Sequence, residues 1–242
     1  MKWVLVTGDS RGLGTEIVRE ILCNSHFGVI GISRSRTFEA ERIEEEFKDR
    51  YVHLNFDLSE PSKIKNLYLN DIKPIGILHG LVNNAAIAYD DIVTNANVDE
   101  IEKMFSVNIT SSILLSKYVL RDFLLNDTKK GSIVNITSVC AHTGYKGLGM
   151  YAASKGAMEA FSRTVAREWG GLGVRSNCVA PGFMETQMSS GLNEDQKQRI
   201  YKRTSLKKET EAQSVASTVR FLLSQESSSI TGQVLHVDNG TI

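Results

Sequence analysis

The sequence predicts a doubly wound α/β fold, in which a seven-stranded parallel sheet carries helices on both faces. Seven short runs rich in β-branched residues recur along the chain. Most are continuously apolar, which is typical of strands buried on both sides. Amphipathic segments such as residues 100–125 separate them, and an alternation of strand and helix indicates a parallel sheet. The predicted strands are residues 3–7, 27–33, 51–57, 77–84, 132–138, 173–181 and 233–238.

Length and charge set the first limits on organisation and partners. The 242 residues contain no linker, low-complexity segment or internal repeat, so we expect one domain over residues 1–242. Lys plus Arg and Asp plus Glu both number 28, which gives a formal net charge of zero. That balance gives no reason to expect a nucleic acid or an anionic membrane surface as a partner.

The cysteines and the apolar runs predict the compartment. Cys23, Cys140 and Cys178 lie far apart, with neither metal-ligand spacing nor the even number of a disulfide framework. No apolar run approaches the roughly 20 residues that span a membrane. The N-terminal run ends at once in a glycine turn, unlike a signal peptide. We therefore expect a reduced, cytoplasmic protein without a metal site.

One segment departs from the alternation of strand and helix. Residues 183–210 are polar, include SSGLNEDQKQ and contain no predicted strand. A long insertion of this kind inside a compact domain is often a lid over a binding site. We expect a substrate lid within residues 183–210, with a plain pair of surface helices as the alternative.

A glycine-rich turn follows the first strand. In VLVTGDSRGLG, the glycines Gly8, Gly12 and Gly14 lie between strand and helix. A backbone without side chains lets a diphosphate approach the helix N-terminus there. The spacing is G-x-x-x-G-x-G rather than the G-x-G-x-x-G of the common dinucleotide fingerprint. Its position nevertheless favours a cofactor site over a turn that only permits tight helix packing.

The end of the second strand predicts the type of cofactor. An acidic residue there binds a ribose 2′-hydroxyl, whereas a basic residue accepts a 2′-phosphate. The strand ends in GISRSR, with Ser33, Arg34 and Arg36 and no acid. Arg11 in the glycine turn is a further guanidinium for the same phosphate. We therefore expect NADP(H) rather than NAD(H); the alternative is that Arg34 and Arg36 are solvated loop charges.

Tyr151 and Lys155 stand four residues apart in MYAASKGAMEAF, and such residues share one face of a helix. A free tyrosine has a pKa of about 10. It donates a proton to a forming alkoxide better when its pKa lies nearer neutrality. We expect the Lys155 ammonium to lower the pKa of Tyr151. Of the neighbours Thr137 and Ser138, which strand alternation sends to opposite faces, Ser138 is the favoured partner.

Seven motifs follow one another in a fixed order. They are TGDSRGLG (7–14), FDLS (56–59), NNAA (83–86), VNITS (107–111), ITSVCAHTGYKGLGMYAASK (136–155), APGFMET (180–186) and ITGQVLHVDNG (230–240). In this order they resemble the short-chain dehydrogenase/reductase family over nearly the whole chain. Within the family, the chain is most similar to the 3-oxoacyl-acyl-carrier-protein reductases of fatty acid biosynthesis. The resemblance implies a Rossmann-type fold.

The resemblance also implies roles for individual residues. Tyr151 is the proton donor, and Lys155 also holds the nicotinamide ribose. Ser138 orients the substrate carbonyl, while Asn108 holds a water that links Lys155 to solvent. Asp57 contacts the adenine. The expected cofactor-binding residues are Gly8, Ser10, Arg11, Gly12, Leu13, Gly14, Ser33, Arg34, Asp57, Leu58, Asn84, Ala85, Ala86, Tyr151, Lys155, Pro181, Gly182, Met184 and Thr186.

Some positions depart from the family pattern. Ala86 and Asn239 stand where relatives usually have glycine, and residues 203–216 lack the proline and glycine of most relatives. In the loop before Tyr151, His142 and Tyr145 either shape substrate choice or are merely solvated. The other histidines have no partner spacing, so we assign them no role.

Together these features predict an NADPH-dependent reductase that converts a ketone to a secondary alcohol. The favoured substrate is a 3-oxoacyl thioester, with an acyl carrier protein as a candidate partner. The alternatives are a reductase or dehydrogenase of another carbonyl in a specialised pathway, and a non-catalytic NADP-binding regulator. By resemblance we also expect a homotetramer. The apolar positions in residues 101–125 and 156–169 permit this, although burial against the chain's own sheet explains the same pattern.

Overall fold

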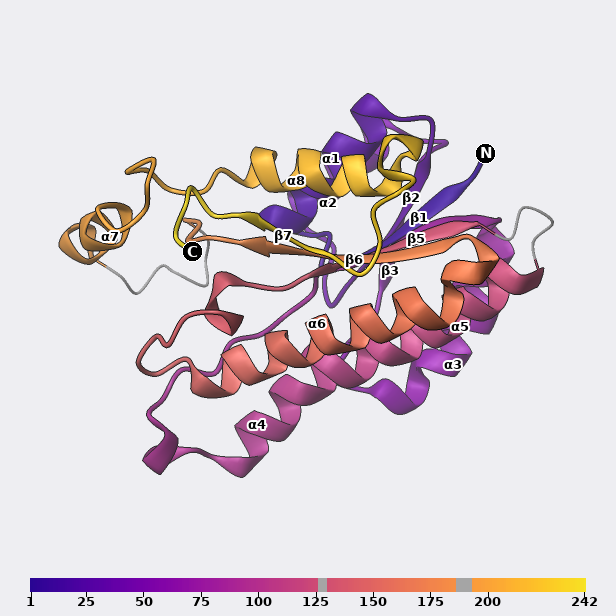
Figure 1. The fold of residues 1–242 in the computed structure, drawn as a ribbon. Helices are drawn as coiled ribbons and strands as arrows, with labels where there is room; N and C mark the ends of the chain where they lie inside the picture. The colour runs from indigo at the N-terminus through magenta and orange to yellow at the C-terminus, as the bar shows by residue number, and fades with distance from the viewer. Residues whose placement is uncertain (126–129, 186–192) are drawn as a thin grey trace.

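A central sheet lies between two layers of helices (Figure 1). The computed structural model describes residues 1–125, 130–185 and 193–242. In that part of the chain, seven parallel strands form one sheet in the order β3-β2-β1-β4-β5-β6-β7. Each predicted run overlaps one strand, so the predicted doubly wound, seven-stranded parallel sheet is confirmed. The strands are β1 (Trp3–Thr7), β2 (Gly28–Ser33), β3 (Tyr51–Asn55), β4 (Leu78–Asn83), β5 (Gly131–Ile136), β6 (Val174–Pro181) and β7 (Val234–Val237).

The helices divide between the two faces of the sheet. Helices α1, α2 and α8 cover one face, and α3, α4, α5 and α6 lie over the other (Figure 1). The chain moves outward from β1 to β3 and then returns to β4 on the other side of β1. In open α/β sheets, such a reversal opens a crevice at the carboxyl ends of the strands. The helices are α1 (Leu13–Asn24), α2 (Phe38–Glu46), α3 (Ile64–Leu67), α4 (Val98–Phe105), α5 (Ser112–Leu125), α6 (Gly149–Trp169), α7 (Glu194–Tyr201) and α8 (Ala212–Leu223).

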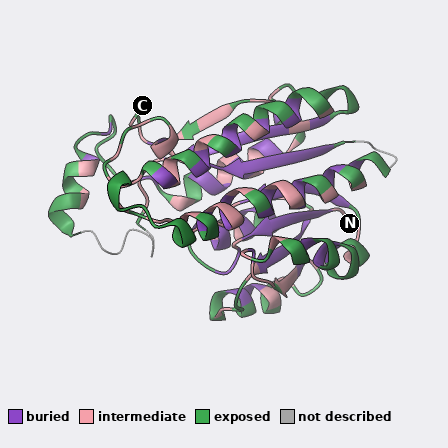
Figure 2. Ribbon diagram, turned by 90° about the horizontal axis from the view of Figure 1, so that it is seen from below, coloured by how far each residue is buried: buried purple, intermediate pink, exposed green. Residues whose placement is uncertain are grey.

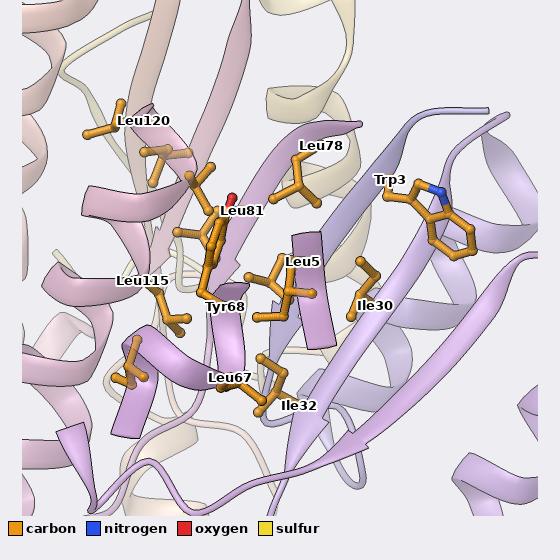
Figure 3. Close-up of a cluster of buried hydrophobic side chains, with 14 of the residues drawn as sticks. Trp3, Leu5, Ile30, Ile32, Leu67, Tyr68, Leu78, Leu81, Leu115 and Leu120 are labelled. Carbon is orange, nitrogen blue, oxygen red and sulfur yellow. The ribbon is translucent and has the colours of Figure 1, made fainter. Parts of the chain in front are cut away.

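Each helical layer encloses its own apolar core. Leu5, Ile30 and Leu81, from adjacent strands, pack with Leu115 and Leu120 of α5 in one of them (Figure 3). The opposite face of the same strands packs against α1 and α8. Figure 2 shows the strands as mostly buried, with the exposed residues on the outer sides of the helices. Burial on both faces is the physical reason for the continuously apolar runs in the sequence.

The amphipathic segment predicted over residues 100–125 is interrupted. Between α4 and α5, residues Ser106–Ser111 form a π-helical turn. Such a turn inserts one extra residue into the helix and is frequently found at functional sites. The hydrophobic pattern did not reveal this interruption, because apolar residues continue through it.

The segment expected to form a lid contains α7, which lies away from the sheet (Figure 1). Residues 186–192, in the middle of that segment, lie outside the described residues. Asn193 caps α7 with a capping box. Its side chain accepts a hydrogen bond from the Gln196 backbone N–H, and the Gln196 side chain accepts one from the Asn193 backbone N–H. None of the described helices is long and apolar enough to cross a membrane.

Candidate active site

The glycine turn between β1 and α1 is built by close backbone contacts. Gly8 and Gly12 adopt φ values of 72° and 55°, in the left-handed region that favours glycine. A side chain at Gly14 would place its Cβ only 1.8 Å from the Gly8 carbonyl oxygen. Nothing lies within 4 Å of a Cβ built on Gly12. The turn is therefore tightly wound on one side and open at the N-terminus of α1, as a diphosphate cradle requires.

The end of β4 is clamped to this turn. The Asn84 side chain donates hydrogen bonds to the Thr7 and Gly8 carbonyls at 2.9 and 3.2 Å. The Thr7 hydroxyl accepts from the backbone N–H groups of Asn84 and Ala85, both at 3.0 Å. In the described residues, the only non-glycine residues with positive φ are Lys207 and Asn239, so Ala86 has ordinary backbone geometry. The alanine that replaces the family glycine is thus accommodated without backbone strain.

The basic residues that follow β2 have different environments. Arg36 forms an ion pair with Glu44 of α2. Arg34 is exposed and close enough to Asp57 for its charge to lower the pKa of that carboxyl. The Ser59 backbone N–H, which donates to Asp57 over 2.9 Å, is the main cause of the lowered pKa. The structure thus places Arg34 near Asp57, whereas Arg36 is ion-paired with α2.

The remaining predicted contacts near the glycine turn lie at or just after the carboxyl ends of β1, β2 and β3. Ser10 is buried, and its carbonyl accepts from the Thr37 hydroxyl at 2.6 Å. Leu13 and Leu58 are buried, and Arg11 is exposed at the turn. The Ser33 hydroxyl donates to the Ser35 carbonyl.

The end of β6 lies at the same carboxyl edge of the sheet. Pro181 ends this strand, and the backbone N–H of Gly182 donates to the Val237 carbonyl at 2.9 Å. Met184 packs against the core between the sheet and α8. Thr186 lies outside the described residues.

Asn108 lies inside the π-helical turn and joins three segments. Its side chain accepts from the Ile87 N–H at 2.9 Å and donates to the Ile87 carbonyl at 3.0 Å. It also donates to the Ser154 hydroxyl of α6 at 3.1 Å. The side chain is buried, and these bonds use both of its polar atoms. Asn108 therefore fixes the loop after β4 against the helix that carries Tyr151 and Lys155.

Tyr151 and Lys155 share one face of α6, as the spacing predicts. The Lys155 ammonium lies 5.6 Å from the centroid of the Tyr151 ring and donates to the Ile136 carbonyl at 2.8 Å. Ser138 follows β5 and lies close enough to Tyr151 to oppose the rise in the pKa of the Tyr151 hydroxyl. The Thr137 hydroxyl instead donates to the Val179 carbonyl. The structure thus brings Ser138, Tyr151 and Lys155 together and turns Thr137 into the sheet.

The expected direction of the Tyr151 pKa is wrong. Burial is the largest effect and raises the pKa of the Tyr151 hydroxyl, and the neighbouring Cys140 and Asp90 raise it further. The hydrogen bond with Ser138 acts in the opposite direction. Burial also lowers the pKa of the Lys155 ammonium to about 8. Desolvation is the dominant effect on both groups, since Lys155 is buried and Tyr151 is partly buried.

Several residues near Tyr151 had no definite role assigned from the sequence. Asp90 and Cys140 flank Tyr151, and burial raises the pKa of both. His142 is not a merely solvated loop residue: its Nε2 lies 2.9 Å from the buried Glu159 carboxylate. Sequence patterns give Asp90 and Cys140 no role, since their proximity to Tyr151 depends on how loops far apart in the sequence fold.

The described residues contain no group of three or more His, Cys, Asp or Glu side chains arranged to hold a metal ion. All three cysteines are free thiols.

Comparison with known proteins decides the family. The sequence matches a short-chain dehydrogenase family, described as Enoyl-(Acyl carrier protein) reductase, over residues 8–241. The chain belongs to the short-chain dehydrogenase/reductase family. It is 35% identical to the 3-oxoacyl-[acyl-carrier-protein] reductase FabG of Salmonella typhimurium over 239 residues, which cover 99% of this chain and 96% of that protein. It is 33% identical to nodulation protein G of a Rhizobium species, across 98% of this chain and 95% of that one.

A solved structure of the same fold is a gluconate 5-dehydrogenase from Burkholderia cenocepacia in complex with NADP and tartrate. The TM-score is 0.88 at 25% identity, and the match covers 99% of this chain and 94% of that one. As a short-chain dehydrogenase/reductase, the chain is an oxidoreductase.

Proposed function

We propose that this oxidoreductase uses NADPH to reduce a ketone to a secondary alcohol, with a 3-oxoacyl thioester as the favoured substrate. One observation carries the proposal: Ser138, Tyr151 and Lys155 come together at the carboxyl edge of the sheet. A cofactor-binding regulator has no need of a proton donor beside a hydrogen-bonding serine and a buried lysine. The FabG relative supports the acyl substrate class.

The residues of the turn fit a dinucleotide. Gly14 permits the close contact with Gly8, and the space beyond Gly12 is open to a phosphate at the N-terminus of α1. Arg34, with Ser33 and without an acid at the end of β2, fits a ribose 2′-phosphate. The bound NADP of the gluconate 5-dehydrogenase supports this assignment. When bound, the nicotinamide supplies the hydride.

The chain's own residues orient the carbonyl and supply the proton. Ser138 donates a hydrogen bond to the carbonyl oxygen and holds it beside Tyr151. The Tyr151 hydroxyl donates the proton to the same oxygen as negative charge develops there. Lys155, with a pKa lowered to about 8, exchanges protons near neutral pH and restores the Tyr151 hydroxyl. Asn108 acts as a positioning residue, because it fixes α6 against the loop after β4.

Residues 183–210 act as the substrate lid in this proposal. The described part is braced internally: Glu185 accepts from the Tyr201 hydroxyl at 2.6 Å and from the Lys197 ammonium at 2.9 Å. The centroids of the Phe183 and Tyr201 rings lie 5.9 Å apart, so this aromatic contact also holds α7 against the start of the segment.

The proposed assembly is a homotetramer of single-domain subunits in the cytoplasm, with acyl carrier protein as a candidate partner. The exposed apolar side chains of Val98 at the start of α4 and of Leu124 and Leu125 at the end of α5 support contact with another copy. Free thiols support a reducing compartment. A light-scattering mass near the 26.8 kDa of one chain would contradict the tetramer.

The test combines cofactor titration with turnover. NADPH and NADH are titrated separately, and nicotinamide absorbance is then followed with an acetoacetyl thioester. We expect tighter binding of NADPH, and turnover that Tyr151→Phe lowers by about 100-fold or more while binding persists. Arg34→Ala removes the preference for NADPH, whereas Arg36→Ala, whose parent side chain is paired with Glu44, serves as the matched control. A preference for NADH would contradict the assignment at the end of β2.

A polyhydroxy acid is the second candidate substrate class, because the gluconate 5-dehydrogenase shares the fold over nearly its full length. Gluconate oxidation with NADP, and reduction of its keto form with NADPH, are measured beside the thioester. Turnover of the sugar acid alone would favour this class and leave the roles of Ser138, Tyr151 and Lys155 unchanged.

A further inference from the structure

Asp9 is a buried carboxylate inside the glycine turn. It lies between Gly8 and Ser10 and is fully inaccessible to solvent. Its Oδ2 atom accepts a hydrogen bond from the Tyr51 hydroxyl at 2.6 Å and lies 2.7 Å from His53 Nδ1. Its Oδ1 atom has no hydrogen-bond partner. An isolated buried carboxylate is costly, so its ionised form depends on the neighbours that balance its charge.

His53 is the group that balances this charge. Its side chain is 2% exposed, and its Nε2 lies 3.0 Å from Asn55 Oδ1. Both ring nitrogens lie within hydrogen-bond distance of an oxygen atom, one of Asp9 and one of Asn55, and this arrangement favours a proton on each nitrogen and hence an imidazolium. The contact with Asp9 accordingly raises the pKa of His53, against the opposing effect of burial. Asp9 and His53 thus form a buried ion pair.

The fold makes room for this pair at one point of the sheet. A Cβ at Gly31 of β2 would lie 1.8 Å from Asp9 Oδ2, so the carboxylate occupies the space above a glycine. Tyr51 and His53 are two residues apart in β3, so their side chains lie on the same face of the strand. Tyr51 stays neutral, since burial and the adjacent carboxylate raise its pKa. The cluster of Asp9, Tyr51 and His53 joins β3 to the turn by side chains alone.

We propose that Asp9, Tyr51 and His53 are positioning residues for the cofactor, and that the His53 imidazolium shields the bound phosphates from the Asp9 carboxylate. This inference rests on the proposed function. The Asp9 carboxylate is separated from the turn by no more than its own short side chain. A phosphate cradled by that turn therefore lies near a negative charge unless His53 neutralises it.

The cluster also predicts how affinity depends on pH. The groups that face His53 are Asp9 from the turn, Tyr51 and Asn55 from β3, and Arg36 from the segment after β2, where Glu44 of α2 pairs with Arg36. The pKa of His53 is raised, so the imidazolium persists to a higher pH than in an unfolded chain. As the pH rises through the folded pKa, the shielding is lost and NADPH binds more weakly.

The test measures NADPH dissociation constants by fluorescence titration for the wild type, His53→Gln, Asp9→Asn and the double variant. His53→Gln retains hydrogen-bonding capacity but loses the charge, and it should weaken binding on the order of tenfold. The double variant D9N/H53Q replaces the ion pair with two neutral amides and should recover most of the affinity.

The pH series provides a second readout that a merely structural role would not change. Lys155 also titrates, with a pKa of about 8, so its contribution must persist in Asp9→Asn, whereas the step due to His53 should disappear. If His53→Gln does not fold, the pH series on the wild type and Asp9→Asn still tests the inference.

Two results would overturn the inference alone. They are an unchanged dissociation constant in His53→Gln, and an equal loss of affinity in the single and double variants. A wild type that binds neither NADPH nor NADH would overturn the proposed function and, with it, this inference.

Discussion

The side-chain amide of Asn108 donates a hydrogen bond to the Ser154 hydroxyl over 3.1 Å, and this contact joins the π-helical turn to α6. Ser154 in turn donates to the Tyr151 carbonyl at 2.7 Å. A short chain of hydrogen bonds thus connects the loop after β4, through Asn108, to the backbone of the proposed proton donor. The π-helical turn that interrupts the helical segment of residues 100–125 is the turn that contains Asn108.

Asn108→Ala should destabilise the protein by about 2 kcal/mol, because it leaves two partly buried backbone groups of Ile87 without their partner. Ser154→Ala removes one side-chain partner from Asn108 and should cost about 1 kcal/mol. Urea unfolding monitored by circular dichroism measures both. Equal losses in the two variants would show that the bonds to Ile87 contribute little.

Stability should depend on pH through Lys155. Burial lowers the pKa of this ammonium to about 8, below the value of about 10.4 in an unfolded chain. The folded chain therefore holds fewer protons than the unfolded chain between these values, and wild-type stability gains up to about 1.4 kcal/mol per pH unit there. The penalty for a buried charge is fully present below pH 8 and is relieved as the pH rises.

Lys155→Met removes this titration. In the absence of cofactor, the variant should be more stable than the wild type at pH 7, and the difference should shrink as the pH approaches 10. Unfolding in urea at a series of pH values measures the difference, with Lys65→Met, at an exposed position, as the control. A difference that stays constant with pH would mean that Lys155 does not titrate in this range.

Asp90 should shift the pH profile of catalysis. Its charge contributes to the raised pKa of Tyr151, so Asp90→Asn should lower that pKa. The rise of alcohol oxidation with pH, for which the phenolate is the base, should then move to lower pH. Asp99→Asn, an exposed substitution on α4, provides the control. Identical profiles for the wild type and Asp90→Asn would contradict the electrostatic link to Tyr151.

Lys207 adopts φ of 57° without the help of a glycine. Lys207→Gly should stabilise the protein by about 1 kcal/mol, because it relieves left-handed strain, despite the loss of the bond from the lysine ammonium to the Lys202 carbonyl. Lys208→Gly is the matched control: its backbone is not left-handed, and its ammonium pairs with Glu211 at 3.0 Å, so it should be destabilising. Thermal unfolding measures both variants. Equal changes in stability would contradict the presence of backbone strain at Lys207.

Asn239 resolves another departure from the family pattern. It also has φ of 57°, a conformation that asparagine tolerates better than most residues. Its side-chain amide donates to the Lys208 and Glu209 carbonyls at 3.1 and 2.6 Å. The asparagine thus replaces glycine and ties the segment after α7 to the C-terminus. Sequence comparison marks the substitution but does not show the two carbonyls.

Local chemistry made much of the fold and part of the site predictable from the sequence. Apolar runs mark strands buried on both faces, and the glycine spacing marks the turn, because each depends on a few adjacent residues. The four-residue spacing of Tyr151 and Lys155 places them on one helix face for the same reason.

Only the tertiary structure decided the rest. Asp9, Tyr51 and His53 meet because Asp9 lies over Gly31 of β2, the strand between β1 and β3, although more than 40 residues separate the carboxylate from each partner. Likewise, the direction of the Tyr151 pKa depends on burial, to which several segments contribute together. Desolvation and long-range pairing are sums over the folded surroundings, and no short stretch of sequence contains them.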